Sequence, residues 1–241
     1  MRSFLAALSL ITCLPLGGFL PTEKELQRCS DYFPLVGLLA GAVIYFPALW
    51  ASEYLGGGVS AVLILLMMEG ISKGFHLDGL ADTADGFLSS RPRDRKLEIM
   101  HDSHTGTMGV AAIVLLFLAK YSCLSSMMPE TAALAAALSV FAGRFALTAY
   151  ILISHYARES GLGKILYTSR PYAGTLIGLI ISLLLSFSFF GNCHFILPTL
   201  IFIVLWNGIC IWQIRGATGD TIGACEQLTE VLVCFQLFIV A

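Results

Sequence analysis

The chain has 241 residues, of which 57% are hydrophobic and only 12% charged, and its mean hydropathy is +0.81. Soluble domains carry about 25% charged residues, so this chain lacks the polar surface that would cover a core in water. The composition excludes a soluble globular enzyme and a disordered chain. The formal net charge of −2 excludes a nucleic-acid binder, because it provides no basic field. We expect an all-α, polytopic integral membrane helix bundle, with residues 1–241 forming one domain.

Apolar segments recur along the chain at the length of membrane-spanning helices, which need about 20 apolar residues. The first, 3–16, is too short to cross, and we expect an interfacial or re-entrant helix there rather than a cleaved signal. Spans are predicted at 34–52, 58–73, 109–128, 132–154, 172–190 and 195–213, and 222–241 is a candidate seventh. The segment 58–73 is short, and we expect its helix to continue into the polar segment that follows.

Lys and Arg residues occur in alternate connections between these spans. The connections near 53–57, 129–131 and 191–194 contain none, whereas the connections on the opposite side all contain them. Positively charged connections are retained in the cytoplasm. We therefore expect the polar segments, and any active site that they form, on the cytoplasmic face.

The segment 69–109 carries seven of the sixteen acidic residues of the chain. Asp78, Asp82 and Asp85 are spaced by four and three residues, so a helix would place all three carboxylates on one face. Such a cluster repels itself unless a cation lies within it, and oxygen ligands favour Mg²⁺ or Ca²⁺. These residues are candidate Mg²⁺ ligands, and Glu69 is a fourth, although Glu69 has a possible partner in Lys73. The alternative is a solvated loop beside the membrane.

Basic residues follow the acidic cluster directly. Arg91, Arg93 and Arg95 provide guanidinium groups that match the oxygens of a diphosphate. Binding of anionic lipid at the membrane surface is the alternative interpretation. Pro92 argues against one continuous helix through this region.

Two further cations, Lys120 and Arg144, lie within predicted spans, where a charged group is costly and indicates a function. We expect each to face the acidic cluster across the bundle or to hold a substrate anion, with snorkelling to the interface as the alternative. Asp220 lies between Thr218 and Gly223 and is a candidate ligand contact. Helix packing through Gly219 and Gly223 is the competing interpretation of that segment.

Three histidines, His76, His101 and His104, lie near the acidic cluster and are candidate hydrogen-bonding groups or general bases. Their spacing alone is weak support for a zinc site. Asp102, between two of them, is a further candidate base or metal ligand.

Four motifs in this chain resemble the cobalamin synthase family, the adenosylcobinamide-GDP ribazoletransferases. They read GFHLDGLADTADGF at 74–87, RDRKLEIMHDSHTGTMGV at 93–110, YARESGLGK at 156–164 and GATGDTIGACEQLTE at 216–230. The resemblance extends over nearly the whole chain. It implies a multi-pass protein of the bacterial inner membrane that transfers a substituted phosphate group in a late step of cobalamin biosynthesis.

The family's reaction joins α-ribazole or its 5′-phosphate to adenosylcobinamide-GDP, releases GMP and requires Mg²⁺. The resemblance therefore implies metal binding by Asp78, Asp82 and Asp85, with catalytic roles for Asp82, Asp102 and Arg93. Substrate-binding roles are expected for Arg91, Arg95, Lys120, Arg144 and Asp220. Expected partners are the two substrates and membrane lipid, with a homo-oligomer or another corrinoid-pathway enzyme as further candidates, and no nucleic acid.

Two other functions compete with this interpretation. The run from Asp82 to Gly86 also fits the start of the metal motif of CDP-alcohol phosphotransferases, but the match stops at Ser89 and Ser90. A Mg²⁺ channel or transporter would also contain acidic residues, yet here they cluster at one face and no internal repeat is visible.

Overall fold

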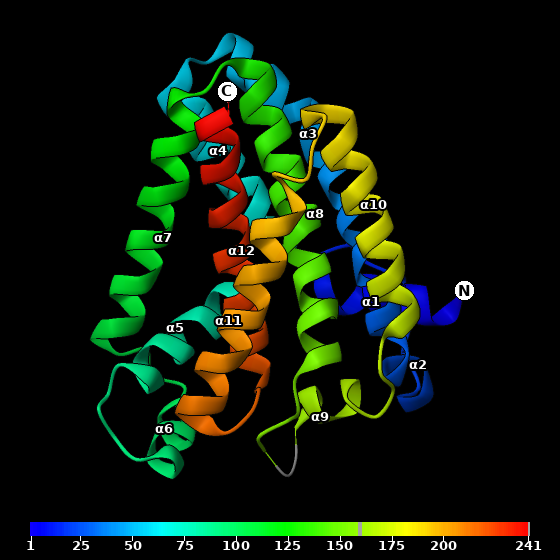
Figure 1. The fold of residues 1–241 in the computed structure, drawn as a ribbon, viewed down its shortest axis with the longest axis vertical. Coiled ribbons are helices and arrows are strands. Elements are labelled where there is room, and N and C mark those ends of the chain that lie inside the picture. Colours follow the sequence, from blue (N-terminus) through cyan, green and yellow to red (C-terminus); the bar gives the residue numbers. More distant parts are fainter. Residues whose placement is uncertain (159–160, 241) are drawn as a thin grey trace.

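The computed structural model describes residues 1–158 and 161–240 as helices joined by loops (Figure 1). Within these ranges there is no β-strand, and Tyr156 and Ala217 form a parallel β-bridge. Six of the described helices are long and apolar enough to cross a membrane. They are α3 (Phe33–Tyr54), which follows the 3-10 turn η1 (Cys29–Tyr32), α7 (Thr107–Ser126), α8 (Pro129–Ile153), α10 (Tyr172–Phe190), α11 (Ile196–Ile214) and α12 (Gly219–Val240). The expected all-α membrane bundle is confirmed, and the candidate span at 222–241 is one of these helices.

The predicted span at 58–73 is interrupted. Helix α4 (Gly57–Ile71) ends before a break, and α5 (Phe75–Phe87) leaves it at an angle of 91°. Lys73 and Gly74 in the break have φ angles of 57° and 69°, in the left-handed region that ends a helix. The expectation that one helix continues into the polar segment was wrong. Instead, α5 is a separate helix that lies across the direction of the long helices (Figure 1).

Helix α8 forms the centre of the bundle and is buried along most of its length. It packs closely against α3 because two glycines of α3 face it. A Cβ atom at Gly37 would lie 2.7 Å from the Cβ atom of Arg144, and one at Gly41 would lie 2.5 Å from the carbonyl oxygen of Ala137. Helices α10 and α11 instead leave many leucine, isoleucine and phenylalanine side chains exposed, as contact with lipid requires.

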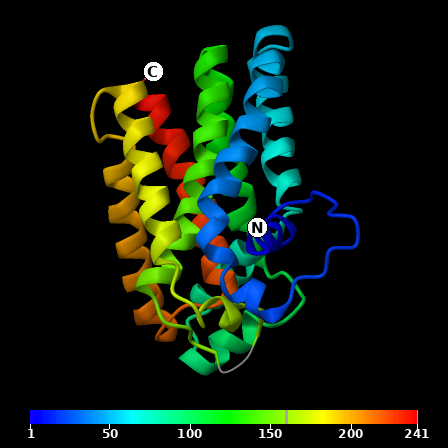
Figure 2. The same ribbon diagram turned by 90° about the vertical axis from the view of Figure 1, so that its right-hand side faces the viewer.

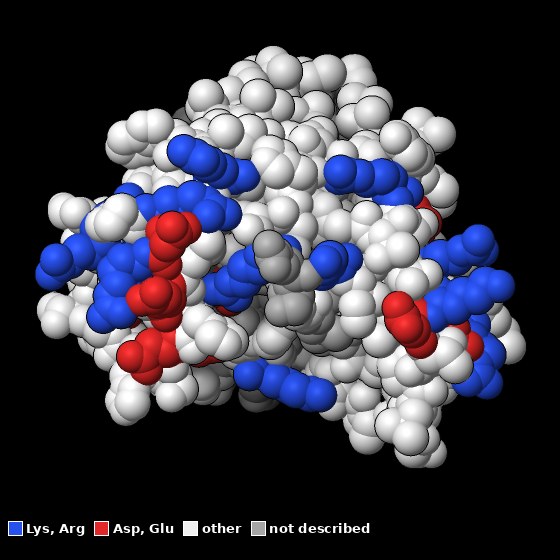
Figure 3. Space-filling model, turned by 90° about the horizontal axis from the view of Figure 1, so that it is seen from below, with Lys and Arg blue, Asp and Glu red and all other residues white. Residues whose placement is uncertain are grey.

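The short helices gather toward one end of the bundle, away from the C-terminus (Figures 1 and 2). They are α1 (Arg2–Ile11), α2 (Glu23–Gln27), α5, α6 (Arg93–Ile99) and α9 (Leu162–Leu166). Helix α1 lies across the long helices and buries Ala6, Ala7 and Ile11. Seen from below, this end displays many Lys and Arg side chains together with acidic ones (Figure 3). It is the face that the sequence predicts to be cytoplasmic.

Candidate active site

Helices α5 and α12 approach each other through glycines, and this contact brings acidic residues from both together. A Cβ atom at Gly79 would lie 2.8 Å from the backbone oxygen of Asp220, and one at Gly223 would lie 3.1 Å from the Cα atom of His76. A Cβ atom at Gly219 would meet nothing within 4 Å. The sequence allowed either close helix packing or a ligand contact in this segment. The position of Gly223 agrees with close packing, and Asp220, three residues earlier, borders a cavity.

Four carboxylates stand close to this crossing. Asp78, Asp82 and Asp85 all lie on α5, as predicted, and Asp220 begins α12. Burial, reinforced by the charges of Asp220, Asp78 and Asp85, raises the pKa of Asp82 to about 7. Arg158 provides the nearby positive charge, with its Nη2 atom 3.0 Å from Oδ2 of Asp220. Negative charge therefore exceeds positive charge here, as at a site that attracts cations.

The predicted Mg²⁺ site stays a prediction. Within 1–158 and 161–240, no three Asp, Glu, His or Cys side chains are arranged to hold a metal ion. Both carboxylate oxygens of Asp85 already accept hydrogen bonds, from the backbone N–H groups of Gly106 (2.6 Å) and Gly109 (2.9 Å). These bonds fasten α5 to the start of α7. Carboxylate oxygens nevertheless form the donor set that Mg²⁺ prefers.

A cavity of about 290 Å³ opens beside the acidic residues. Its polar lining comes from His76, Asp78, His101, Tyr156, Arg158 and Asp220, and its apolar lining includes Leu10, Ile11, Phe33, Leu147 and Leu166. Each of the four motif segments recognised in the sequence contributes to this lining. Residues separated by more than 140 positions thus meet at one site.

The other predicted catalytic acid, Asp102, lies apart from the described cavity lining. Its side chain is exposed and accepts a hydrogen bond of 2.7 Å from Nδ1 of His104, two residues away. Hydrogen bonds from the ring and backbone of His104 lower the pKa of Asp102. Of the three candidate histidines, His76 and His101 line the cavity, whereas His104 is exposed.

The three arginines predicted to contact a diphosphate, Arg91, Arg93 and Arg95, are not among the residues that line the cavity. Arg93 donates to the backbone oxygens of Ile214 (3.0 Å) and Ala157 (3.1 Å), so it ties α6 to the loops that follow α8 and α11. Arg95 forms an exposed ion pair with Glu98, and Arg91 is exposed at the start of α6. The arginine beside the carboxylates is instead Arg158. The sequence analysis includes Arg158 only as part of the motif at 156–164 and does not single it out.

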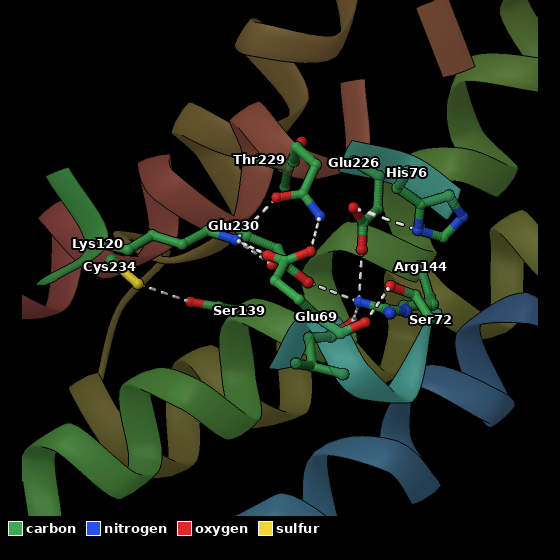
Figure 4. A network of polar contacts seen from close by, with 12 residues as sticks. Glu69, Ser72, His76, Lys120, Ser139, Arg144, Glu226, Thr229, Glu230 and Cys234 are labelled. Carbon is green, nitrogen blue, oxygen red and sulfur yellow. Dashed lines mark hydrogen bonds and ion pairs between the residues drawn. The ribbon is translucent and has the colours of Figure 1, made fainter. Parts of the chain in front are cut away.

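Lys120 lies fully buried in an ion network between α4, α7 and α12 (Figure 4). Its Nζ atom is 3.0 Å from Glu69, 2.9 Å from Gln227 and 2.6 Å from Glu230. Lys120 does face acidic residues across the bundle, but they are Glu69 of α4 and Glu230 of α12 and not the acidic residues of α5. The carboxylate of Glu69 accepts hydrogen bonds from Lys120 and Gln227, so Glu69 is not grouped with the acids of α5 and does not pair with Lys73.

Arg144 extends the same network toward the cavity. Its Nη1 atom lies 2.5 Å from both Glu226 and Glu230, and Nδ1 of His76 lies 3.3 Å from Oε2 of Glu226 (Figure 4). Because His76 also borders the cavity, buried charges connect the membrane interior to the site. The signal that could have found these partners is the pair of glutamates four residues apart in an apolar span, matched by two cations in other spans.

The fold and the site define a polytopic helical membrane protein with a carboxylate-lined cavity at one end. The family model for cobalamin-5-phosphate synthase matches residues 3–238, and the chain belongs to that family. Curated relatives named adenosylcobinamide-GDP ribazoletransferase include those of Klebsiella pneumoniae (37% identical, over 98% of this chain and 99% of theirs) and Clostridium novyi (33%, over 98% and 96%). A Clostridium botulinum relative is 32% identical over 100% of this chain and 98% of its own. No solved structure matches.

Proposed function

We propose that this protein is an adenosylcobinamide-GDP ribazoletransferase that joins α-ribazole or its 5′-phosphate to adenosylcobinamide-GDP and releases GMP. Membership of the family over nearly the whole chain supports this assignment. The observation that carries it is the convergence of the four motif segments on one cavity. A transporter would not require this convergence of motif residues at one end of the bundle.

The reaction breaks the phosphoanhydride bond of the donor's diphosphate and forms a new phosphate ester bond. A ribose hydroxyl of the acceptor attacks the phosphorus that bears the cobinamide arm, and the bond from that phosphorus to the oxygen of GMP breaks. The hydroxyl proton passes to a base, and negative charge grows on the GMP oxygen. Such transfers depend mainly on positioning and on stabilising charge, so no covalent nucleophile is needed.

Residues that line the cavity, together with Asp82, which does not line it but interacts electrostatically with Asp78 and Asp220, suit these tasks. Asp78, Asp82 and Asp220 are the carboxylates that would hold Mg²⁺, which when bound would neutralise the diphosphate and improve GMP as a leaving group. Arg158 lies beside Asp220 and is placed to meet phosphate oxygens. Asp102 remains a candidate base on the adjoining loop, and Arg91 and Arg95 on or beside α6 remain candidate phosphate contacts.

The membrane location follows from the same reasoning. We place the protein in the bacterial inner membrane, with the cavity on the cytoplasmic face, because the basic residues gather at that end of the bundle (Figure 3). The large corrinoid would then approach from the membrane surface, with its GDP arm directed toward the carboxylates.

The test is turnover by the purified protein in lipid nanodiscs, supplied with adenosylcobinamide-GDP and α-ribazole 5′-phosphate. We expect Mg²⁺-dependent formation of the corrinoid product with one GMP released per product, both followed by chromatography. Folded protein that forms no product under these conditions would refute the assignment. Reaction with CDP-alcohol donors, or cation flux without a soluble product, would favour the two competing functions.

A further inference from the structure

The cavity at the site has a polar side and an apolar side. Its acidic and basic lining comes from α5, from the loop after α8 and from α12. The apolar side is the group formed by Leu10, Ile11, Phe33, Leu147 and Leu166, which belong to one apolar cluster of the fold or pack against it. Phe75 of α5 and Ile222 of α12 are further apolar residues of the lining. Phosphate chemistry at the carboxylates accounts for the polar side only, so the apolar side needs an occupant of its own.

We infer that the apolar side of this cavity binds the aromatic base of the acceptor nucleoside and directs its ribose toward Asp78 and Asp220. This inference rests on the proposed function, since it names where one of the two substrates lies. The occupant is a bicyclic, weakly polar base of the dimethylbenzimidazole type.

The size of the cavity favours the acceptor over the corrinoid. Small-molecule pockets measure roughly 300–1,000 Å³, and this one, at about 290 Å³, lies at the lower limit of that range. A nucleoside fits such a volume, whereas a corrin macrocycle with its side chains does not. The corrinoid must therefore stay outside, with only its phosphate arm at the polar side.

The chemistry of the wall favours an apolar base over the guanine of the donor. The side chains of Leu10, Ile11, Phe33, Leu147 and Leu166 carry no hydrogen-bonding atoms, and all five belong to one apolar cluster of the fold or pack against it. Guanine would bury polar edges against that wall without partners, and each polar group that loses water without gaining a hydrogen bond weakens binding. The methyl groups of dimethylbenzimidazole would instead gain from the same contact.

Helix α1 borders the apolar side of the cavity. Ala6, Ala7 and Ile11 are buried against the bundle, and Leu10 and Ile11 border the cavity. The short N-terminal helix, too short to span a membrane, therefore closes the base-binding side. Replacing Leu10 is the mildest way to reduce that space, because its side chain is only partly buried.

The test compares Leu10→Trp with Leu14→Trp, a matched control in the exposed segment after α1. Binding of α-ribazole to each protein in nanodiscs is measured by the fluorescence of the base, and KM is measured for both substrates. Leu10→Trp should weaken acceptor binding by roughly tenfold or more, the effect expected for a filled apolar pocket. The donor KM and the control variant should be unchanged.

Two further measurements keep the inference falsifiable. Leu166→Phe narrows the cavity from α9, so it should give the same acceptor-specific loss if Leu10→Trp does not fold. An acceptor whose benzimidazole lacks both methyl groups should lose less affinity in either variant. Unchanged acceptor binding in both folded variants, or a rise in the donor KM alone, would overturn the inference while wild-type turnover still upheld the proposed function. Absence of wild-type turnover with α-ribazole still bound would instead refute the proposed function.

Discussion

Replacing Asp82 by Asn tests two effects of the acidic cluster separately: how much it lowers the stability of the fold and how much it contributes to turnover. In the metal-free protein, burial and three neighbouring carboxylates raise the pKa of Asp82 from 3.8 to about 7. A change of about 3 pH units corresponds to about 4 kcal/mol at most. Because the side chain is only partly buried, solvent screening reduces this to about 1–2 kcal/mol.

The sign follows from the direction of that change. An acid with a raised pKa binds its proton more tightly in the folded state, so stability falls as pH rises from about 4 to 7 and the full cost applies above pH 7. At pH 8 in EDTA, Asp82→Asn should therefore unfold a few degrees higher than wild type. The same variant should lose about 100-fold or more of its turnover, since it removes one charge of the proposed Mg²⁺ site.

The assay is thermal unfolding in nanodiscs at pH 8 and at pH 5, with EDTA and with Mg²⁺, alongside turnover. Asp94→Asn is the control, because Asp94 is an exposed carboxylate on α6, and neither quantity should change in it. Mg²⁺ should stabilise wild type more than Asp82→Asn. Lower stability of Asp82→Asn in EDTA, or wild-type turnover in that variant, would refute the reasoning.

Three other predictions concern the site and its support. The Mg²⁺ concentration for half-maximal turnover should rise about tenfold per pH unit below about pH 7, because a proton competes at Asp82; equal requirements at pH 6 and 8 would contradict this. Lys120→Met should cost about 3–5 kcal/mol of unfolding free energy, measured in nanodiscs, and adding Glu230→Gln should restore part of it. If Lys120→Met alone were as stable as wild type, the ion network would not stabilise the fold as argued. Gly79→Ala should reduce both turnover and stability because its Cβ meets backbone at 2.8 Å, whereas Gly219→Ala, with open space, should be neutral in both assays.

The bundle could be predicted from sequence because lipid restricts what can cross it. Uninterrupted apolar runs must become helices, and each predicted span overlaps a helix of matching character. The break after α4 could not be predicted in the same way. Hydropathy does not report backbone angles, and Lys73, with its φ of 57°, is not a residue type that marks a left-handed turn.

The site was predictable only where its residues are neighbours in sequence. Asp78, Asp82 and Asp85 share a helix, so their spacing was enough to group them. Arg158 and Asp220 are 62 positions apart, and their ion pair depends on how the loops after α8 and α11 pair. For Arg93, sequence proximity to the acidic cluster was misleading, since its partners include backbone oxygens 64 and 121 residues away.

The deep ion network and the cavity share one face of α12. Asp220, Gly223, Gln227 and Glu230 recur at spacings of three or four residues, so they line one side of that helix. Buried ion pairs add little net stability, but they fix how helices are rotated against each other, because any other rotation leaves a charge unpaired. Here the pairing of Glu230 with buried cations fixes the rotation of α12, and the same rotation turns Gly223 and Asp220 toward α5. The charges inside the membrane thus set the geometry of the carboxylates at its edge.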